Sequence, residues 1–522
     1  MSSIAGDLPP PAPATSEAFK RNFIVACAMA AMFMQTLDQT IANVALPNMQ
    51  GSLGASRDQI TWVLTSYIMA SAIMTAPIGW LASRFGKRRL ILIAVTGFTL
   101  SSALCGAAQS LEQIILFRLL QGAFGAALGP LSQTIMVDLF PPERRGSVMG
   151  IWGMGVMLGP ILGPTLGGVL TDTFNWRWVF YINVPVGIAA AMGLLAFYDD
   201  ASNNRAMRFD WFGFGLLAVG LGALQLMLDR GTQQGWFNST EIVIQAILAL
   251  LGLYLFVVHM VTARNPFIRT EIFKDRNFVS ALFLMFVTGG LLVASSALLA
   301  PFLQTLGGYS VTDAGLLMVP RGVGTMLAMA MVGNLAMRFD VRMVITFGAA
   351  TLLWTCWAMS QWTPAVSEWT ICWTGFVQGF GTGFIFVPMN LVAFATVSPE
   401  LRTDASAIMN LMRNIGAAIF VSVTTTVLSA SVQIVHAEMA ANITPFNRAL
   451  QVNAPSMMWN PQLPFGLQQL DAVINRDALQ IAYANDFLFM FYASVPVLLF
   501  TWLIRKPQLR ARPKPEDLQP SE

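Results

Sequence analysis

The chain has 522 residues, of which 55% are hydrophobic and 11% are charged, and its formal net charge is +3. A soluble protein carries about 25% charged residues, so this composition excludes a soluble globular protein and indicates an integral membrane protein. The small net charge does not suggest nucleic acid as a partner, and with only two histidines and no phosphate-binding glycine loop we expect no metal, no cofactor and no ATP-driven pump.

Apolar stretches of about 20 residues, the length that crosses a bilayer, recur along the chain. They predict an all-α protein with fourteen transmembrane helices. The predicted spans are 22–46, 59–82, 90–109, 113–138, 146–171, 177–198, 211–229, 241–262, 278–304, 313–337, 342–361, 369–397, 404–429 and 486–505. Most of the 30 Lys and Arg residues then fall on one side, which predicts that both termini are cytoplasmic.

An internal repeat predicts how the spans are grouped. Three short sequences recur in order at nearly one offset: 79–85 as 333–339, 121–122 as 378–379, and 142–143 as 399–400. Parallel six-span halves are the plan of one large class of secondary transporters. We therefore expect a disordered cytoplasmic tail (1–20), an N-terminal six-helix half (21–200), two inserted helices (201–264), a C-terminal six-helix half (265–505) with a long periplasmic loop (430–485), and a cytoplasmic tail (506–522).

The first span contains an acidic residue, Asp38, in an otherwise apolar stretch. A carboxylate at the centre of a bilayer costs about 3 kcal/mol, and taking up a proton removes that charge. We expect Asp38 to bind and release a proton within the membrane; the alternative is a structural carboxylate paired to a fixed partner. Gln35, Gln39 and Asn43 recur every four residues beside it, and this polar stripe should face protein or a wet cavity.

The loop after the second span reads GWLASRFGKRRL and contains Gly79, Arg84, Gly86 and Arg88. Its glycines allow two helix ends to approach closely, and its cations lie at the cytoplasmic face. The loop resembles the signature of the major facilitator superfamily, which implies that it holds the two halves together there and controls their opening. Ser83 stands where that family usually has an acid, which removes one charged partner.

The fourth span contains a cation, Arg118, followed by Gly122, Gly125 and Gly129 on the same face. A buried guanidinium does not lose its proton, so it needs an anion or several carbonyl groups. This stretch resembles the fourth-span motif of the superfamily, which implies that Arg118 takes part in proton transfer. The alternative is a structural charge held by backbone carbonyls.

The fifth span contains a glycine ridge, which allows another helix to approach closely. The ridge consists of Gly155, Gly159, Gly163 and Gly167. Pro160 and Pro164 lie beside it and allow a kink. The stretch resembles the antiporter motif of the superfamily, which exporters carry and importers generally lack, and which implies a seal between the halves. The alternative is a tightly packed helix without that role.

Three further stretches, 175–187, 209–213 and 224–231, complete a resemblance that extends from residue 20 to 505. Together with 37–47, they resemble the fourteen-span drug:proton antiporters of the EmrB/QacA type, and most closely the EmrB branch. The resemblance implies a major facilitator fold with 14 transmembrane helices arranged as 6 + 2 + 6.

This resemblance also implies a function. It implies proton-coupled efflux of hydrophobic or amphiphilic drugs across the inner membrane by alternating access, with a periplasmic membrane-fusion adaptor and an outer-membrane channel as partners. The alternative on the same fold is a proton-coupled importer or exporter of a specific metabolite. No nucleophile–base pair is visible, so we do not expect an enzyme.

Two further features lie in the C-terminal part of the chain. Arg321 and Arg413 lie within spans, and we expect each either to pair with Asp38 or line the cavity, or to be structural. Within the long outer loop, residues 467–484 are amphipathic and helical in pattern, with apolar positions such as Leu470, Val473 and Ile474 near one another. This face could contact the adaptor, lie on the membrane or belong to an ordinary connecting loop.

Overall fold

The structure is a computed structural model that describes residues 14–141, 144–199, 209–263, 266–441, 443 and 464–505. These residues form α-helices joined by turns and short 3-10 helices, and they contain no β-strand. The all-α prediction is therefore confirmed. Its physical reason is that backbone polar groups inside a bilayer must find their hydrogen-bond partners within the protein, as a helix provides.

The helices of the first part of the chain are α1 (Ala14–Leu53), α2 (Arg57–Ile60), α3 (Trp62–Thr75), α4 (Ile78–Phe85), α5 (Lys87–Ala107), α6 (Leu111–Gly125), α7 (Leu128–Leu139), α8 (Arg145–Thr173), α9 (Trp178–Tyr181) and α10 (Asn183–Phe197). The helices of the rest are α11 (Trp211–Arg230), α12 (Thr240–Thr262), α13 (Arg276–Thr305), α14 (Val311–Arg338), α15 (Val341–Ser360), α16 (Glu368–Thr396), α17 (Arg402–Ala441) and α19 (Pro464–Thr501).

Thirteen helical stretches of the described residues are long and apolar enough to cross a membrane, and the number is fourteen if α3 and α4 form one bent span. The two helices meet at an angle of 58°. The bend lies at Pro77, whose ring lacks the N–H group that would continue the helical hydrogen bonds. Each of the fourteen predicted spans corresponds to one of these stretches.

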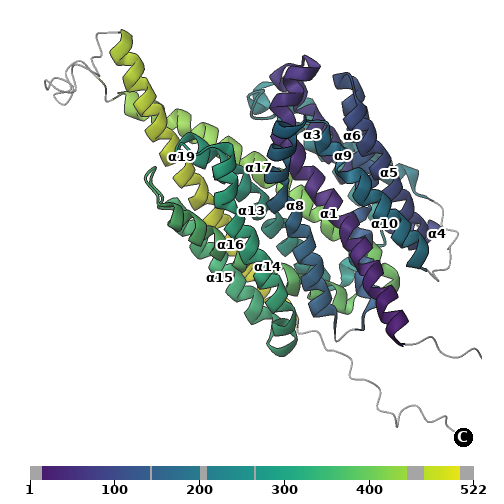
Figure 1. The fold of residues 1–522 in the computed structure, drawn as a ribbon. Coiled ribbons are helices and arrows are strands. Elements are labelled where there is room, and N and C mark those ends of the chain that lie inside the picture. The colour runs from purple at the N-terminus through teal and green to yellow at the C-terminus, as the bar shows by residue number, and fades with distance from the viewer. Residues whose placement is uncertain are drawn as a thin grey trace, which may run out of the picture.

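The helices form two sides of one bundle. Figure 1 shows α1 to α10 on one side and α13 to α19 on the other, with α8 and α14 between them. Buried apolar side chains fill the interior of each side. We call these groups of helices the N-terminal side and the C-terminal side.

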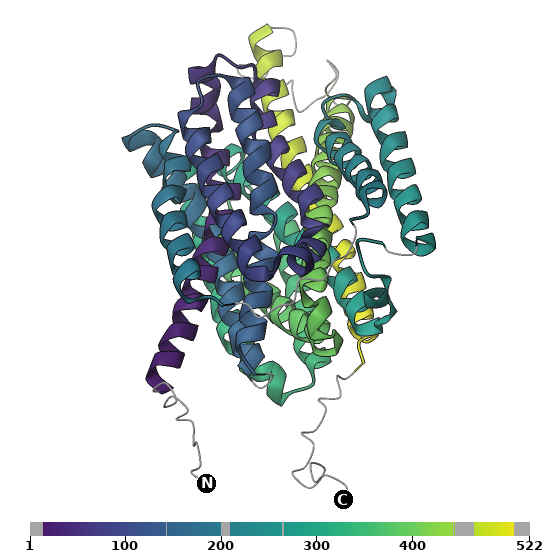
Figure 2. The same ribbon diagram turned by 90° about the vertical axis from the view of Figure 1, so that its right-hand side faces the viewer.

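The helices α11 and α12 form a pair at the edge of the bundle (Figure 2). They approach closely because glycines face each other: a Cβ atom on Gly252 would lie 2.9 Å from the Cα of Gly220. The pair also contacts the C-terminal side, where the Ser422 hydroxyl donates a hydrogen bond of 3.0 Å to the Leu228 carbonyl.

The helix α1 begins and α19 ends at the same face of the bundle, which we call the terminal face (Figure 2). The opposite face is the distal face. Because consecutive spans alternate in direction, α4, α7, α14 and α16 end at the terminal face, and α5, α8, α13 and α17 begin there.

Two expectations about the connecting segments are corrected. The helix α1 already begins at Ala14, within the tail that we expected to extend to residue 20. In the long outer loop, the helix predicted over 467–484 is present as part of α19, which begins at Pro464, and the correction is that α17 also continues to Ala441. The other parts of these expectations concern residues that the structure does not describe, namely 1–13, 200–208, 442, 444–463 and 506–522.

Candidate functional site

The candidate site is centred on an ion pair between α1 and α6. Arg118 Nη1 donates a hydrogen bond of 2.5 Å to Asp38 Oδ2, and both residues are fully buried. The buried charges of Asp38 and Arg118 therefore neutralise each other. An ion pair in an apolar interior is maintained only when further hydrogen bonds satisfy the remaining donors and acceptors.

Two amides provide such hydrogen bonds to the carboxylate. Gln121 Nε2 donates to Asp38 Oδ1 at 2.9 Å, and Asn183 Nδ2 donates to the same oxygen at 3.3 Å. Ser102 positions Asn183, because its Oγ accepts a hydrogen bond of 3.1 Å from Nδ2. The carboxylate of α1 is therefore surrounded by two side chains of α6 and one of α10, and α5 contributes the serine that positions the latter.

The guanidinium group has partners other than the carboxylate. Arg118 Nε donates to the Val63 carbonyl at 3.1 Å, and Nη1 also donates to Gln121 Oε1 at 2.9 Å. The centre of the guanidinium lies 4.2 Å from the centre of the Tyr67 ring, a cation–π contact. Arg118 therefore keeps several stabilising contacts if Asp38 becomes neutral.

The polar stripe predicted beside Asp38 is only partly buried. Gln35 is 5% exposed, and its Oε1 has no hydrogen-bond partner among the described residues. Gln39 is half-buried, whereas Asn43 is exposed. The stripe therefore lies against protein at its first two members and is open at Asn43, and its facing a wet cavity there stays a prediction.

The two arginines of the C-terminal side do not pair with Asp38, so that alternative is wrong. Arg321 donates to three groups of α13, the Leu292 carbonyl and two serine hydroxyls, at distances between 2.5 and 3.0 Å. Arg413 is half-buried and lies against Gly289, also on α13. Its side chain forms no ion pair or hydrogen bond within the part of the chain that the structure describes.

The glycines of the loop between α4 and α5 lie where the predicted close approach requires them. Gly86 ends α4 with a φ of +81°, a backbone conformation that glycine adopts without strain. Gly79 faces α17 across the boundary between the two sides, and a Cβ atom on it would lie 2.9 Å from the Cα of Asp404.

The two predicted arginines of this loop differ in their surroundings. Arg84 is exposed, whereas Arg88 donates to the Leu195 carbonyl at 2.7 Å and pairs with Asp199 at 3.3 Å. Lys20 also contacts Asp199, at 3.0 Å, and its hydrogen bond and positive charge lower the pKa of this carboxyl group below its ordinary value. Arg88 therefore stabilises the N-terminal side rather than the boundary between the sides.

Two groups of polar contacts connect the two sides at the terminal face, and we call them the terminal-face lock. The first crosses the boundary through the Arg402–Asp138 ion pair, and the second through a hydrogen bond from Arg269 to Ser83. In the first, Asp138 of α7 pairs with Lys87 at 2.6 Å and with Arg402 of α17 at 2.7 Å. In the second, Arg269 lies 3.5 Å from Asp404. All of these carboxylates lie at helix ends on the terminal face, so the structure shows this face closed.

The serine that replaces the usual acid of the loop takes part in the second group. Arg269 Nη2 donates to Ser83 Oγ at 3.4 Å, and this hydroxyl donates to the Gly79 carbonyl at 3.0 Å. A neutral hydroxyl therefore accepts a hydrogen bond at the position where the family signature has a charged side chain. The carboxylate in contact with Arg269 comes instead from Asp404 on the other side of the boundary.

A buried polar contact lies deeper along the same boundary. Gln133 Nε2 of α7 donates to Asn390 Oδ1 of α16 at 2.7 Å, and the Ser406 hydroxyl of α17 donates to Gln133 Oε1 at 2.5 Å. These residues, like Asp138, Arg402, Arg269 and Asp404, are not predicted as site residues from the sequence. Their only signal in the sequence is a polar side chain within or beside an apolar span, which does not indicate its partner.

The glycine ridge of α8 packs on α1, the helix that carries Asp38. A Cβ atom on Gly159 would lie 2.5 Å from the backbone carbon of Thr36 and 2.6 Å from the Leu37 nitrogen. The Thr40 hydroxyl donates a hydrogen bond of 3.1 Å to the Gly159 carbonyl. The close approach predicted from the glycine spacing is therefore present, and its partner is α1.

The other face of α8 contacts the C-terminal side. Here Gly146 faces Gly333 of α14, and a Cβ atom on Gly333 would lie 3.1 Å from the Ser147 nitrogen. The helix continues without interruption through Pro160 and Pro164. The contact between the two sides along α8 is therefore made here by glycines outside the ridge, whereas the ridge itself packs within the N-terminal side.

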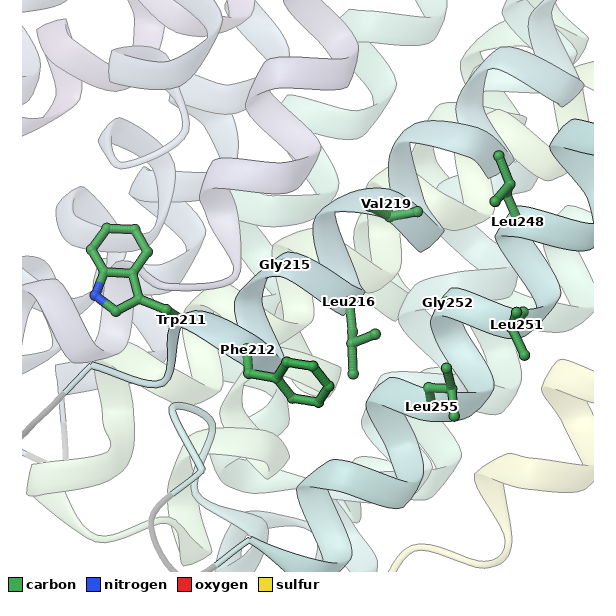
Figure 3. A pocket seen from close by; sticks show the side chains of 9 residues that line it. All are labelled: Trp211, Phe212, Gly215, Leu216, Val219, Leu248, Leu251, Gly252 and Leu255. Carbon is green, nitrogen blue, oxygen red and sulfur yellow. The ribbon is translucent and has the colours of Figure 1, made fainter.

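A surface pocket of about 340 Å³ lies between α11 and α12 and shares no residue with the Asp38 network (Figure 3). Its lining is apolar and includes Trp211, Phe212 and Leu255.

The described residues contain no group of three or more His, Cys, Asp or Glu side chains placed to hold a metal ion.

Comparison with known proteins gives a consistent result along the chain. Residues 28–421 match the family model of the Major Facilitator Superfamily. The chain is 34% identical to the multidrug export protein EmrB of Escherichia coli K12 over 487 residues, which covers 91% of this chain and 94% of that protein. It is 35% identical to EmrB of Haemophilus influenzae over 419 residues (80% and 82%), and 32% identical to the fatty acid resistance protein FarB of Neisseria gonorrhoeae over 486 residues (91% and 94%).

Solved structures show the same fold at low sequence identity. The human organic anion transporter MFSD10 superposes with a TM-score of 0.58 at 14% identity, covering 91% of this chain and 99% of that one. A bacterial homologue of the human lysosomal transporter Spinster, in an inward-facing and unoccupied conformation, gives 0.56 at 19% identity (93% and 98%). Both similarities concern the fold.

Proposed function

The chain belongs to the major facilitator superfamily, and from this premise we propose that it is a proton-coupled multidrug exporter that works by alternating access. It is a multi-span transporter rather than an enzyme. The export of drugs is supported by its similarity over nearly its whole length to relatives named as multidrug export proteins. Hydrophobic or amphiphilic drugs are the proposed substrates.

The observation that carries proton coupling is the buried pair of Asp38 and Arg118. We propose that a proton binds to the Asp38 carboxylate. The neutral carboxyl group keeps its amide contacts with Gln121 and Asn183 but loses the attraction of the guanidinium. The contact between α1 and α6 weakens, whereas Arg118 remains satisfied by the Val63 carbonyl and the neighbouring groups.

The packing of α1 provides a route from this event to the opening of the molecule. The helix α1 lies in the glycine ridge of α8, and α8 contacts α14 of the C-terminal side through Gly146 and Gly333. A shift of α1 against α6 therefore also displaces α8, the helix at the boundary between the two sides. We propose that gating uses this boundary together with the terminal-face lock, which is formed in the conformation described here and broken when the terminal face opens.

The energy of one proton is sufficient for export. At an inside-negative potential of about 150 mV, one returning proton releases roughly 3.5 kcal/mol. At about 1.4 kcal/mol per tenfold change, this sustains a drug gradient of roughly 300-fold if the drug itself carries no net charge across.

The test uses purified protein in proteoliposomes with ethidium as the probe and a pH-sensitive dye to follow protons. We expect ethidium to move against its own concentration gradient while protons move in the opposite direction, down the imposed proton gradient. A protonophore should abolish this movement of ethidium. The Asp38→Asn variant should lose drug-evoked proton release, whereas Asp172→Asn, which removes an exposed carboxylate on α8, should not. Movement of the probe together with protons would indicate an importer, and normal coupling in Asp38→Asn would exclude Asp38 from the mechanism.

We also propose that the protein lies in the inner membrane with both termini, and hence the terminal face, in the cytoplasm. The excess of Lys and Arg in the segments on that side supports this orientation. The relatives come from bacteria and are named as multidrug export proteins, which supports the membrane assigned.

A periplasmic adaptor and an outer-membrane channel complete the proposal. The distal ends of α17 and α19, up to Ala441 and from Pro464, provide a surface for the adaptor. On α19 the Leu470 and Ile474 side chains are buried, whereas Val473 is 40% exposed and available to a partner. We expect Val473→Asp to reduce co-purification of the adaptor and resistance in cells, with transport in proteoliposomes unchanged. Unchanged co-purification would exclude this surface.

A further inference from the structure

The helix α19 contains, past its middle, a buried acid that has no role in the function proposed above. Three carboxylates are buried among the described residues, and two of them face a guanidinium: Asp38 faces Arg118, and Asp404 faces Arg269. The third is Asp486, which has no measurable exposure. Neither of its carboxylate oxygens accepts a hydrogen bond from a described residue.

The surroundings of this carboxyl group are apolar and aromatic. The next residue, Phe487, packs on Trp362 with ring centres 6.1 Å apart, and Tyr483 packs on Phe302 at 5.3 Å. Trp362 follows the distal end of α15, and Phe302 lies in the last turn of α13. Asp486 therefore lies near the distal end of the C-terminal side, on the opposite side of the bundle from Asp38.

The ionisable groups of the neighbouring helices do not supply a partner. The helices α13, α15 and α17 pack against α19. Their ionisable residues are Arg276, Arg342, Cys356, Arg402, Asp404, Arg413, His436 and Glu438. None of these forms an ion pair or hydrogen bond with Asp486 in the described part of the chain. On its own helix, Asp486 interacts electrostatically with Tyr483, which is neutral in its ordinary state and supplies no positive charge.

The positions of these ionisable residues along their helices explain why none of them pairs with Asp486. Arg276 and Arg342 lie at the terminal ends of α13 and α15. Arg413 lies against Gly289, near the middle of α13, whereas Asp486 is at the level of the last turn of that helix. His436 lies farther toward the distal end, where it contacts Asp471 at 3.0 Å.

An isolated ionised carboxylate is very costly in an apolar interior, and such a group becomes neutral by binding a proton. We propose that Asp486 is a second proton-binding site of this protein, in the C-terminal side, and that it holds its proton in the conformation described here. The step is the association of one proton with one carboxylate oxygen. Its contribution to transport, one additional proton per cycle, rests on the drug:proton antiport proposed above, whereas proton binding itself does not.

The direct test is infrared spectroscopy of the purified full-length protein at neutral pH, which requires no substrate. We expect wild type to show a band of a protonated carboxyl group that Asp486→Asn lacks. Asp477→Asn removes an exposed carboxylate from the same helix and should retain the band, as should Asp38→Asn. Asp486→Glu should shift the band without abolishing it, which keeps the test decisive if the Asn variant does not fold. Spectra that are identical in wild type, Asp486→Asn and Asp486→Glu would show that the group is ionised and would overturn the proposal.

The second test measures the number of protons exchanged for each ethidium ion in proteoliposomes. We expect this ratio to fall by one in Asp486→Asn and to be unchanged in Asp477→Asn. An unchanged ratio in Asp486→Asn would remove the residue from coupling. If wild type exports no ethidium, the proposed function fails for this probe, and the infrared result still decides whether Asp486 binds a proton.

Discussion

The residue that most clearly combines a structural with a functional role is Arg118. Its guanidinium satisfies the buried Asp38 and at the same time holds α3 through the Val63 carbonyl. Removing one partner of a buried ion pair leaves an uncompensated charge and costs about 3–5 kcal/mol, whereas removing both charges costs much less. The energetic role of the pair can therefore be separated from its role in proton transfer.

We predict that Arg118→Gln lowers the thermal unfolding temperature of the purified protein strongly, because it leaves the Asp38 charge buried without a cation. Asp38→Asn in the same chain should restore part of the loss, since no charge then remains. The measurement is a double-mutant cycle in which the unfolding temperatures are converted to free energies of unfolding. The expected coupling free energy is about 1–3 kcal/mol. Additive losses in the double variant would contradict a direct electrostatic coupling.

At the scale of helices, the contact between α1 and α8 depends on glycine. The backbones approach so closely at Gly159 that even one added methyl group meets backbone atoms of α1. Backbone atoms of a helix cannot move aside as the end of a flexible side chain can. This contact therefore constrains the position of the helix that carries Asp38.

We predict that Gly159→Ala destabilises the protein by about 1–3 kcal/mol through overpacking and lowers the rate of export. Gly168 on the same helix is the matched control, because no atom lies within 4 Å of a Cβ placed there. Gly168→Ala should leave export unchanged and stabilise the helix slightly, since alanine favours a helix more than glycine by about 1 kcal/mol. The measurements are unfolding temperature and export rate at equal expression. Equal effects of the two substitutions would show that the ridge is not tightly packed.

At the scale of the whole molecule, the contacts between the two sides gather at the terminal face. The ion pairs of the lock's first group are partly exposed, with 29% of the Asp138 side chain accessible. Such pairs are individually weak because solvent screens them. Weak contacts suit a face that must open and close in every transport cycle.

We predict that Asp138→Asn shifts the population toward conformations with an open terminal face, because it removes the attraction for both Lys87 and Arg402. The shift should be no more than about tenfold, equivalent to about 1.4 kcal/mol. Spin labels on cysteines at positions 84 and 338, both exposed at this face, should show longer distances in the variant. Asp172→Asn is the control, and distances that do not change in Asp138→Asn would show that this ion pair does not hold the face closed.

The sequence by itself determined the elements of this protein and the nature of its unusual residues. Apolar runs of bilayer length identified every span, because a helix is the only way for a single segment to satisfy its backbone within lipid. The glycine spacing of α8 predicted a close helix contact. The cost of charge in a membrane marked Asp38 and Arg118 as residues that need partners.

Only the tertiary structure decided which partners these residues have. Arg118 rather than Arg321 or Arg413 faces Asp38, and the ridge packs on α1. The terminal-face lock and the unpaired Asp486 also emerged only from the packed helices. The physical reason is that hydrophobicity and helix periodicity are properties of a single segment, whereas an ion pair depends on the relative rotation and height of two helices. The sequence of either helix alone specifies neither.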